Sequence, residues 1–139
     1  ELGPQAKQTV LDDYLGHGEK VLVIDDEERQ REIACGMLNK LGYVADAVPS
    51  GNDAIEYLKQ YPVDMILLDM VMPAMGGSEA FNRLKEINDK VKVILLSGYS
   101  IEGEATEIME RGCNGFIQKP FKMETLQEMI RKILNRSCA

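Results

Sequence analysis

Short apolar runs alternate with amphipathic stretches along the chain from about residue 19 onward. Five runs predict β-strands because apolar residues fill most of their successive positions: 21–24, 43–48, 65–68, 91–96 and 115–118. The run at 43–48 is the weakest of the five. Strands that are apolar at nearly every position are buried on both faces, which favours a parallel sheet between layers of helices.

The stretch after each strand has the period of an amphipathic helix. Gly42 is expected to end the first helix, and Ser50 to cap the second, with Asp53 three residues later. The predicted apolar faces are Ile33, Met37, Leu38 and Leu41; Ala54, Ile55 and Leu58; Ala80, Phe81, Leu84 and Ile87; Ile101, Ala105, Ile108 and Met109; and Leu126, Met129, Ile130, Ile133 and Leu134. Five strand–helix units with right-handed crossovers predict a doubly wound α/β sheet of order 2-1-3-4-5.

The length of 139 residues fits one domain. Residues 1–18 lack a clear apolar period, so we expect a linker or the end of a preceding element there, followed by the compact domain at 19–136 and a tail at 137–139. No apolar run approaches the length of a membrane span, and the first residues do not have the pattern of a signal peptide.

The charge and the cysteines narrow the class of function. A net charge of −7 argues against direct binding to nucleic acid, which favours basic surfaces. Cys35, Cys113 and Cys138 are odd in number and lack CxxC spacing. We therefore expect free thiols and a reducing, cytoplasmic location.

Polar residues stand at the end of four of the five apolar runs. Asp25 and Asp26 follow the first run, Asp69 the third, Ser97 the fourth and Lys119 the fifth. In a doubly wound sheet the carboxyl ends of the first and third strands border the ligand-binding crevice. We therefore expect these side chains to meet there.

Three carboxylates at one point repel each other, by about 4 kcal/mol per pair at ~4 Å and an effective dielectric of ~20. Such a cluster calls for a cation, a shared proton or abundant solvent, and oxygen ligands suit Mg²⁺, with Mn²⁺ as an alternative. With the metal and Lys119 neutralising a phosphoryl group, Asp69 is free to act as nucleophile and form an acyl phosphate. A simpler interpretation is that the acids cap the helices that follow them.

At these residues the chain resembles the receiver domain of two-component response regulators. The resemblance covers about residues 19–136 and rests on the motifs VLVIDDE, LLDMVMPAMGG, LLSGYS and GFIQKPF in this order and spacing. It implies a flavodoxin-like fold with a five-stranded parallel sheet flanked by five helices. It also implies that the domain assists its own phosphorylation and dephosphorylation.

The resemblance assigns roles residue by residue. Asp69 is similar to the phosphoacceptor, Asp25 and Asp26 to the acids of the Mg²⁺ site, and Val71 to the residue whose backbone carbonyl binds the metal. Ser97 resembles the switch hydroxyl, and Lys119 the phosphate-binding lysine.

Two further residues match the family's pattern. The bond before Pro120 resembles the family's cis peptide. Phe116 stands at the position of the switch aromatic, often Tyr, and lacks its hydroxyl. Phosphorylation is therefore expected to draw Ser97 inward and to open space that the Phe116 ring can fill.

The implied partners are a histidine kinase or phosphotransfer domain as phosphodonor, and a downstream protein. The downstream protein would bind the face made by the fourth helix, fifth strand and fifth helix. The LLSGYS motif and the residues before the domain are similar to receivers fused behind hybrid histidine kinases.

Two alternative functions remain open from sequence. A metal-dependent aspartyl-phosphate phosphatase usually has a second acid two residues after the nucleophile, where this chain has Val71. A flavodoxin-like binding module needs a phosphate-cradling loop after the first strand, where this chain has four consecutive acids.

Overall fold

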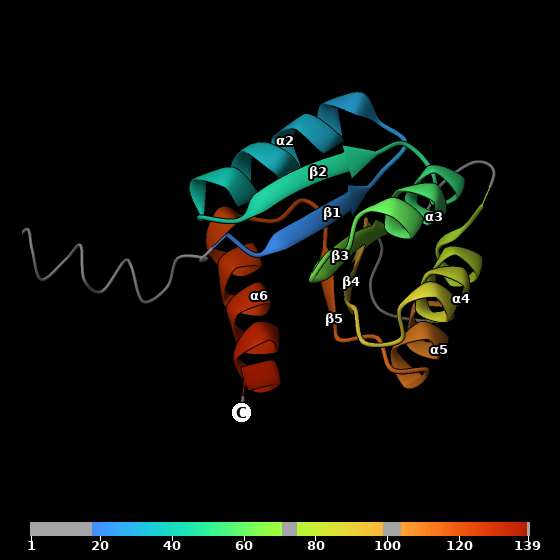
Figure 1. Ribbon diagram of the computed structural model, residues 1–139. Helices are drawn as coiled ribbons and strands as arrows, with labels where there is room; N and C mark the ends of the chain where they lie inside the picture. The colour runs from blue at the N-terminus through green and yellow to red at the C-terminus, as the bar shows by residue number, and fades with distance from the viewer. Residues whose placement is uncertain (1–17, 71–74, 99–103, 139) are drawn as a thin grey trace, which may run out of the picture.

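A five-stranded parallel sheet lies between two layers of helices (Figure 1). The computed structural model of the chain describes residues 18–70, 75–98 and 104–138. The elements in chain order are β1 (Lys20–Ile24), α2 (Glu28–Lys40), β2 (Val44–Val48), α3 (Gly51–Gln60), β3 (Met65–Asp69), α4 (Gly77–Ile87), β4 (Lys92–Ser97), α5 (Glu104–Glu110), β5 (Gly115–Gln118) and α6 (Met123–Cys138). The strand order is β2-β1-β3-β4-β5, as predicted.

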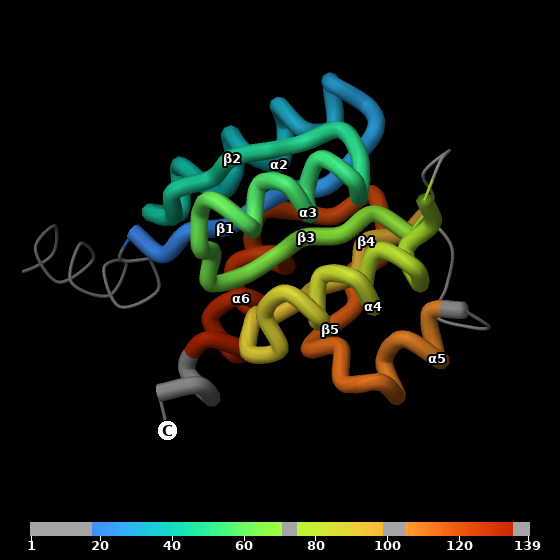
Figure 2. Tube along the Cα trace, turned by 45° about the vertical axis from the view of Figure 1, so that its right-hand side comes forward, coloured from blue at the N-terminus to red at the C-terminus, as the bar shows by residue number. Residues whose placement is uncertain are grey.

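The helices divide between the two faces of the sheet, α2 and α6 on one and α3, α4 and α5 on the other (Figures 1 and 2). Successive residues of each strand point to opposite faces of the sheet. In β1, Leu22 and Ile24 pack with the α3–α5 layer, whereas Val21 and Val23 pack with α2 and α6. All four are at most 1% exposed, which confirms that the central strands are buried on both sides.

The turns follow the chemistry that the sequence indicated. Gly42 follows Leu41, the C-cap of α2, with φ of +93°, a conformation that suits glycine. The Oγ atom of Ser50 caps α3 by accepting a hydrogen bond of 3.1 Å from the amide of Asp53.

Within the described ranges, none of the helices combines the length and apolar character needed to cross a membrane.

Two predicted core positions are wrong. Ile33 is 46% exposed and Ile87, the last residue of α4, is 37% exposed. Helix α2 instead turns Ala34 and Leu38 toward the sheet, and Leu41 continues this buried line. Residues 33 and 34 differ by about 100° around a helix axis, so burial of Ala34 carries Ile33 outward. The predicted Ile101 lies outside the described residues.

Cys35 and Cys113 are free thiols, and Cys35 is half-buried whereas Cys113 is buried. Burial raises the pKa of the Cys113 thiol, which also donates to the carbonyl of Val93 at 3.1 Å. This thiol therefore links the loop between α5 and β5 to β4. Helix α6 continues to Cys138, through most of the predicted tail.

The Ser50 cap predicts a measurable contribution to stability. Replacing Ser50 by Ala leaves the amide of Asp53 without its side-chain acceptor, so Ser50→Ala should lower the free energy of unfolding by about 1 kcal/mol. Ser50→Thr keeps a hydroxyl acceptor and should recover most of the loss. Urea unfolding followed by circular dichroism measures both variants, and an Ala variant as stable as the original would contradict this role.

Candidate functional site

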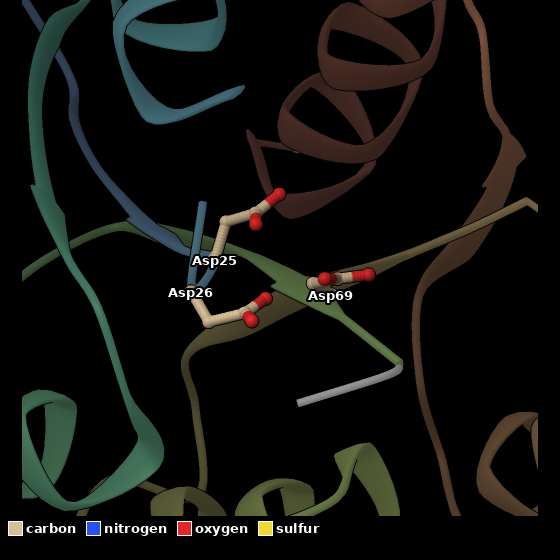
Figure 3. Close-up of side chains that lie close together, drawn as sticks. All are labelled: Asp25, Asp26 and Asp69. Carbon is tan, nitrogen blue, oxygen red and sulfur yellow. The ribbon is translucent and has the colours of Figure 1, made fainter. Parts of the chain in front are cut away.

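Three acids meet where β1 and β3 end. The carboxylates of Asp25, Asp26 and Asp69 offer oxygens that all lie within 4.8 Å of one another. Figure 3 shows Asp25 and Asp26 after the end of β1 and Asp69 at the end of β3, with the carboxylates close together. Asp25 and Asp69 are buried, whereas Asp26 is exposed. The sheet thus brings together acids that are more than 40 residues apart in the sequence.

Lys119, the residue after β5, joins this cluster. Its Nζ atom lies 3.1 Å from Oδ2 of Asp25 and 3.2 Å from Oδ1 of Asp69. Burial lowers the pKa of Lys119, but attraction to Asp69 and Asp25 outweighs burial and leaves the pKa above its usual range. Lys119 is therefore a permanent cation at neutral pH. It offsets one of the three carboxylate charges.

Asp25 is held at several atoms. Its amide donates to the carbonyl of Val48 at 3.2 Å, and its Oδ1 accepts from the amide of Glu27 at 3.0 Å. Its Oδ2 accepts from Lys119. Both carboxylate oxygens of Asp25 therefore have protein partners, whereas the exposed Asp26 is more accessible to a cation.

Simple helix capping does not account for the acids. The N-cap of α2 is Glu27, and the N-cap of α4 is Gly76. Asp25 binds the amide of Glu27, which lies before the helix begins. The capping interpretation is therefore wrong for the helices that follow β1 and β3.

Ser97 is the last residue of β4 and is buried. Asp69 pairs in register with Leu96, so Ser97 lies one residue beyond the level of Asp69 on the next strand. The backbone amide of Lys119 donates to the carbonyl of Ser97 at 2.6 Å, which ties β5 to β4 at the same edge. The strand order therefore places the backbone of Ser97 and Lys119 on the side of Asp69 away from β1, and the Lys119 side chain reaches back to both Asp69 and Asp25.

Phe116 lies deeper in the sheet. It pairs with Leu95, is half-buried and packs against the core between the sheet and helices α3–α5. Since alternate strand residues share a face, Ser97 has the same facing as Leu95. Ser97 and Phe116 thus belong to neighbouring strands on one side of the sheet.

Two other predicted features have different outcomes. The Lys119–Pro120 peptide bond is cis, as the resemblance implied. Val71, the proposed donor of a backbone carbonyl, lies outside the described residues.

Arg31 is a neighbour of the site that the sequence analysis did not single out. Its Nη1 atom donates to the backbone carbonyl of Asp25 at 2.8 Å. In the sequence it is one of several alternating charges on α2, and only its place one turn into the helix after the acid pair distinguishes it.

The donor set fits a hard divalent cation. Three carboxylates beside a single ammonium leave excess negative charge, and exposed Asp26 leaves one side open to water. Mg²⁺ prefers oxygen ligands and usually retains several waters, so these residues match its requirements.

Comparison with known proteins gives a consistent result. The family model described as the response regulator receiver domain matches residues 21–131. The autoinducer 1 sensor kinase/phosphatase LuxN of Vibrio harveyi is 34% identical over 119 residues, which are 86% of this chain and 14% of that protein. The chemotaxis protein CheY of Halobacterium salinarum is 30% identical over 115 residues, covering 83% of this chain and 96% of that protein.

A solved structure adds detail about one relative's site. The receiver domain of the sensor histidine kinase PA1611 from Pseudomonas aeruginosa has a TM-score of 0.77 and 26% identity. The match covers 85% of this chain and 98% of that one. That structure holds a magnesium ion coordinated in its active-site cleft.

Repulsion within the acid cluster predicts that Asp26→Asn stabilises the metal-free protein. Asp26 is exposed, so removing its charge relieves repulsion without burying a new group. The expected gain in unfolding free energy is on the order of 1 kcal/mol, the Coulomb energy of a close pair in water. Urea unfolding in a chelator measures it.

The matched control is Asp89→Asn, which removes a carboxylate from an exposed loop residue outside the cluster. It should change stability by less than Asp26→Asn does. A loss of stability in the Asp26→Asn protein would show that the three carboxylates do not repel each other in the folded state.

Proposed function

The chain belongs to the response regulator receiver domain family, and we propose that Asp69 is its phosphoacceptor. The chain is therefore a phosphoacceptor signalling domain of two-component signal transduction. The main support is the position of Asp69. It is the acid at the end of the central strand β3, its carboxylate contacts Lys119, and it lies close to the carboxylates of both other acids. The family match does not favour the phosphatase or flavodoxin-like alternatives.

We propose that Asp26 and Asp69 bind Mg²⁺ directly, with Asp25 contributing through water and Val71 through its carbonyl. Bound Mg²⁺ would neutralise charge on the phosphoryl oxygens. Lys119, which contacts both Asp25 and Asp69, would supply a second positive charge, and Ser97 would donate a hydrogen bond. The fit of the donor set, together with the magnesium ion in the PA1611 receiver, supports this assignment.

The phosphodonor is a phosphohistidine of a histidine kinase or phosphotransfer domain. A carboxylate oxygen of Asp69 attacks phosphorus, the bond between phosphorus and the imidazole nitrogen breaks, and the imidazole leaves with the electron pair. The acyl phosphate then adds negative charge beside Lys119 and Ser97. Lys119 is positioned to pair with it because its ammonium already lies 3.2 Å from Asp69.

Intact mass spectrometry tests the phosphoacceptor. Incubation with acetyl phosphate and Mg²⁺ should add a single phosphoryl group, and the addition should disappear in a chelator and in Asp69→Asn. Asp64→Asn, a change at an exposed acid at the opposite end of β3, should be phosphorylated normally. A second modified site, or full phosphorylation of Asp69→Asn, would overturn the assignment.

We further propose that phosphorylation changes the face formed by α5, β5 and α6. Ser97 would move toward the phosphoryl oxygens, and the half-buried Phe116 ring would fill the space it leaves. The two residues lie on neighbouring strands and one side of the sheet, which supports this coupling. A downstream protein would then recognise the altered face.

Structures with and without beryllofluoride and Mg²⁺ test this switch. The Ser97 hydroxyl should approach the phosphoryl mimic, and the Phe116 ring should become more buried. In ring-labelled protein, Ser97→Ala should abolish the chemical-shift change of Phe116, whereas Ser97→Thr should retain it. Unchanged positions of Ser97 and Phe116 in both states would contradict the mechanism.

The larger context is also a proposal. The chain spans 14% of LuxN but 96% of the Halobacterium CheY, so relatives include both a receiver within a long sensor kinase and a single domain. The motif similarity favours a receiver within a hybrid histidine kinase. We propose that the domain acts in the cytoplasm, without contacting nucleic acid or membrane.

A further inference from the structure

The corner between β1 and α2 carries both residues of the acid pair, and one side chain of α2 reaches back to it. Arg31 donates from Nη1 to the backbone carbonyl of Asp25 at 2.8 Å. The amide of Arg31 also bonds the carbonyl of Glu27 at 3.0 Å, which starts the regular helix. The guanidinium therefore ties the body of α2 to the residue that follows β1.

This contact bears on Asp26 through the backbone. Asp25 is fixed by Val48 at its amide, by Glu27 and Lys119 at its carboxylate and by Arg31 at its carbonyl. The carbonyl of Asp25 belongs to the peptide unit that also contains the amide of Asp26. Because peptide units are planar, fixing that carbonyl also restricts the orientation of the backbone at Asp26.

We propose that Arg31 is a positioning residue that orients Asp26 for binding of the divalent cation. The inference rests on the proposed metal site. Arginine suits the task because its hydrogen bond is charge-assisted and its planar fork loses little entropy when it binds. Without this contact, part of the cation's binding free energy would be needed to order the corner.

The charge of Arg31 has the opposite effect on affinity. A guanidinium beside the acid cluster repels an incoming cation, so an electrostatic role alone predicts that Arg31→Gln binds Mg²⁺ more tightly. A positioning role predicts weaker binding. The direction of the change in affinity therefore separates the two roles.

The experiment is a calorimetric titration of Mg²⁺ into chelator-treated protein. Arg31→Gln should raise the dissociation constant by about 10-fold, the lower end of the effect of removing groups that orient metal ligands. Arg31→Lys keeps the charge on a shorter side chain that lacks the planar fork. It should also bind Mg²⁺ more weakly than the original protein.

The matched control is Arg29→Gln. It removes the same charge from an exposed position on the same helix and should change the dissociation constant less than about 2-fold, because an exposed charge is well screened. Amide hydrogen exchange of the metal-free proteins provides a second readout. The Glu27 amide, which bonds Asp25, should exchange faster in Arg31→Gln than in Arg29→Gln.

The outcomes separate this inference from the proposed function. If the original protein fails to bind Mg²⁺, the proposed metal site is wrong. If it binds, and folded Arg31→Gln and Arg31→Lys bind equally well or more tightly, only the positioning role is overturned. If Arg31→Gln does not fold, Arg31→Lys decides alone, since an electrostatic role predicts unchanged affinity for it.

Discussion

The arrangement of the site depends on the repulsion among three carboxylates placed at the ends of two buried strands. Asp25 and Asp69 are removed from bulk water, which would otherwise screen them, and the Lys119 ammonium offsets one charge. Continuum arguments make such a cluster costly unless further positive charge arrives. The same excess of negative charge that strains the metal-free domain provides the driving force for binding a cation. A bound cation would in turn let a phosphoryl dianion approach Asp69, as phosphoryl transfer requires.

The sheet makes this concentration of charge possible. Strands β1 and β3 are neighbours in the order β2-β1-β3-β4-β5, and each is covered on both faces by helices. Their apolar residues secure the register, so the side chains at the strand ends have fixed positions. The two helix layers contact different parts of the site. On the α2 side Arg31 bonds the backbone carbonyl of Asp25, whereas on the α3–α5 side the half-buried Phe116 packs against the core.

Most of the fold and the central acids could be predicted from the sequence because they depend on period and order. Buried parallel strands read as continuous apolar runs, and the topology then brings Asp25, Asp69 and Lys119 to one edge. What escaped prediction depends on helix rotation and on side-chain reach. Burial of Ala34 instead of Ile33 follows from how α2 packs on the sheet, which no local pattern specifies. The hydrogen bond from Arg31 to a backbone carbonyl could not be predicted from residue type, since many exposed helices carry similar alternating charges.

Phosphorylation of the domain is expected to form an acyl phosphate on Asp69. Borohydride reduces an acyl phosphate to an alcohol, so an aspartyl phosphate becomes homoserine, and peptide mass mapping locates the altered residue. The phosphorylated chain should yield homoserine at position 69, with Asp25 and Asp26 unchanged, and only when Mg²⁺ was present during phosphorylation. Homoserine at position 25 or 26, or a phosphorylated chain that yields none, would contradict the account.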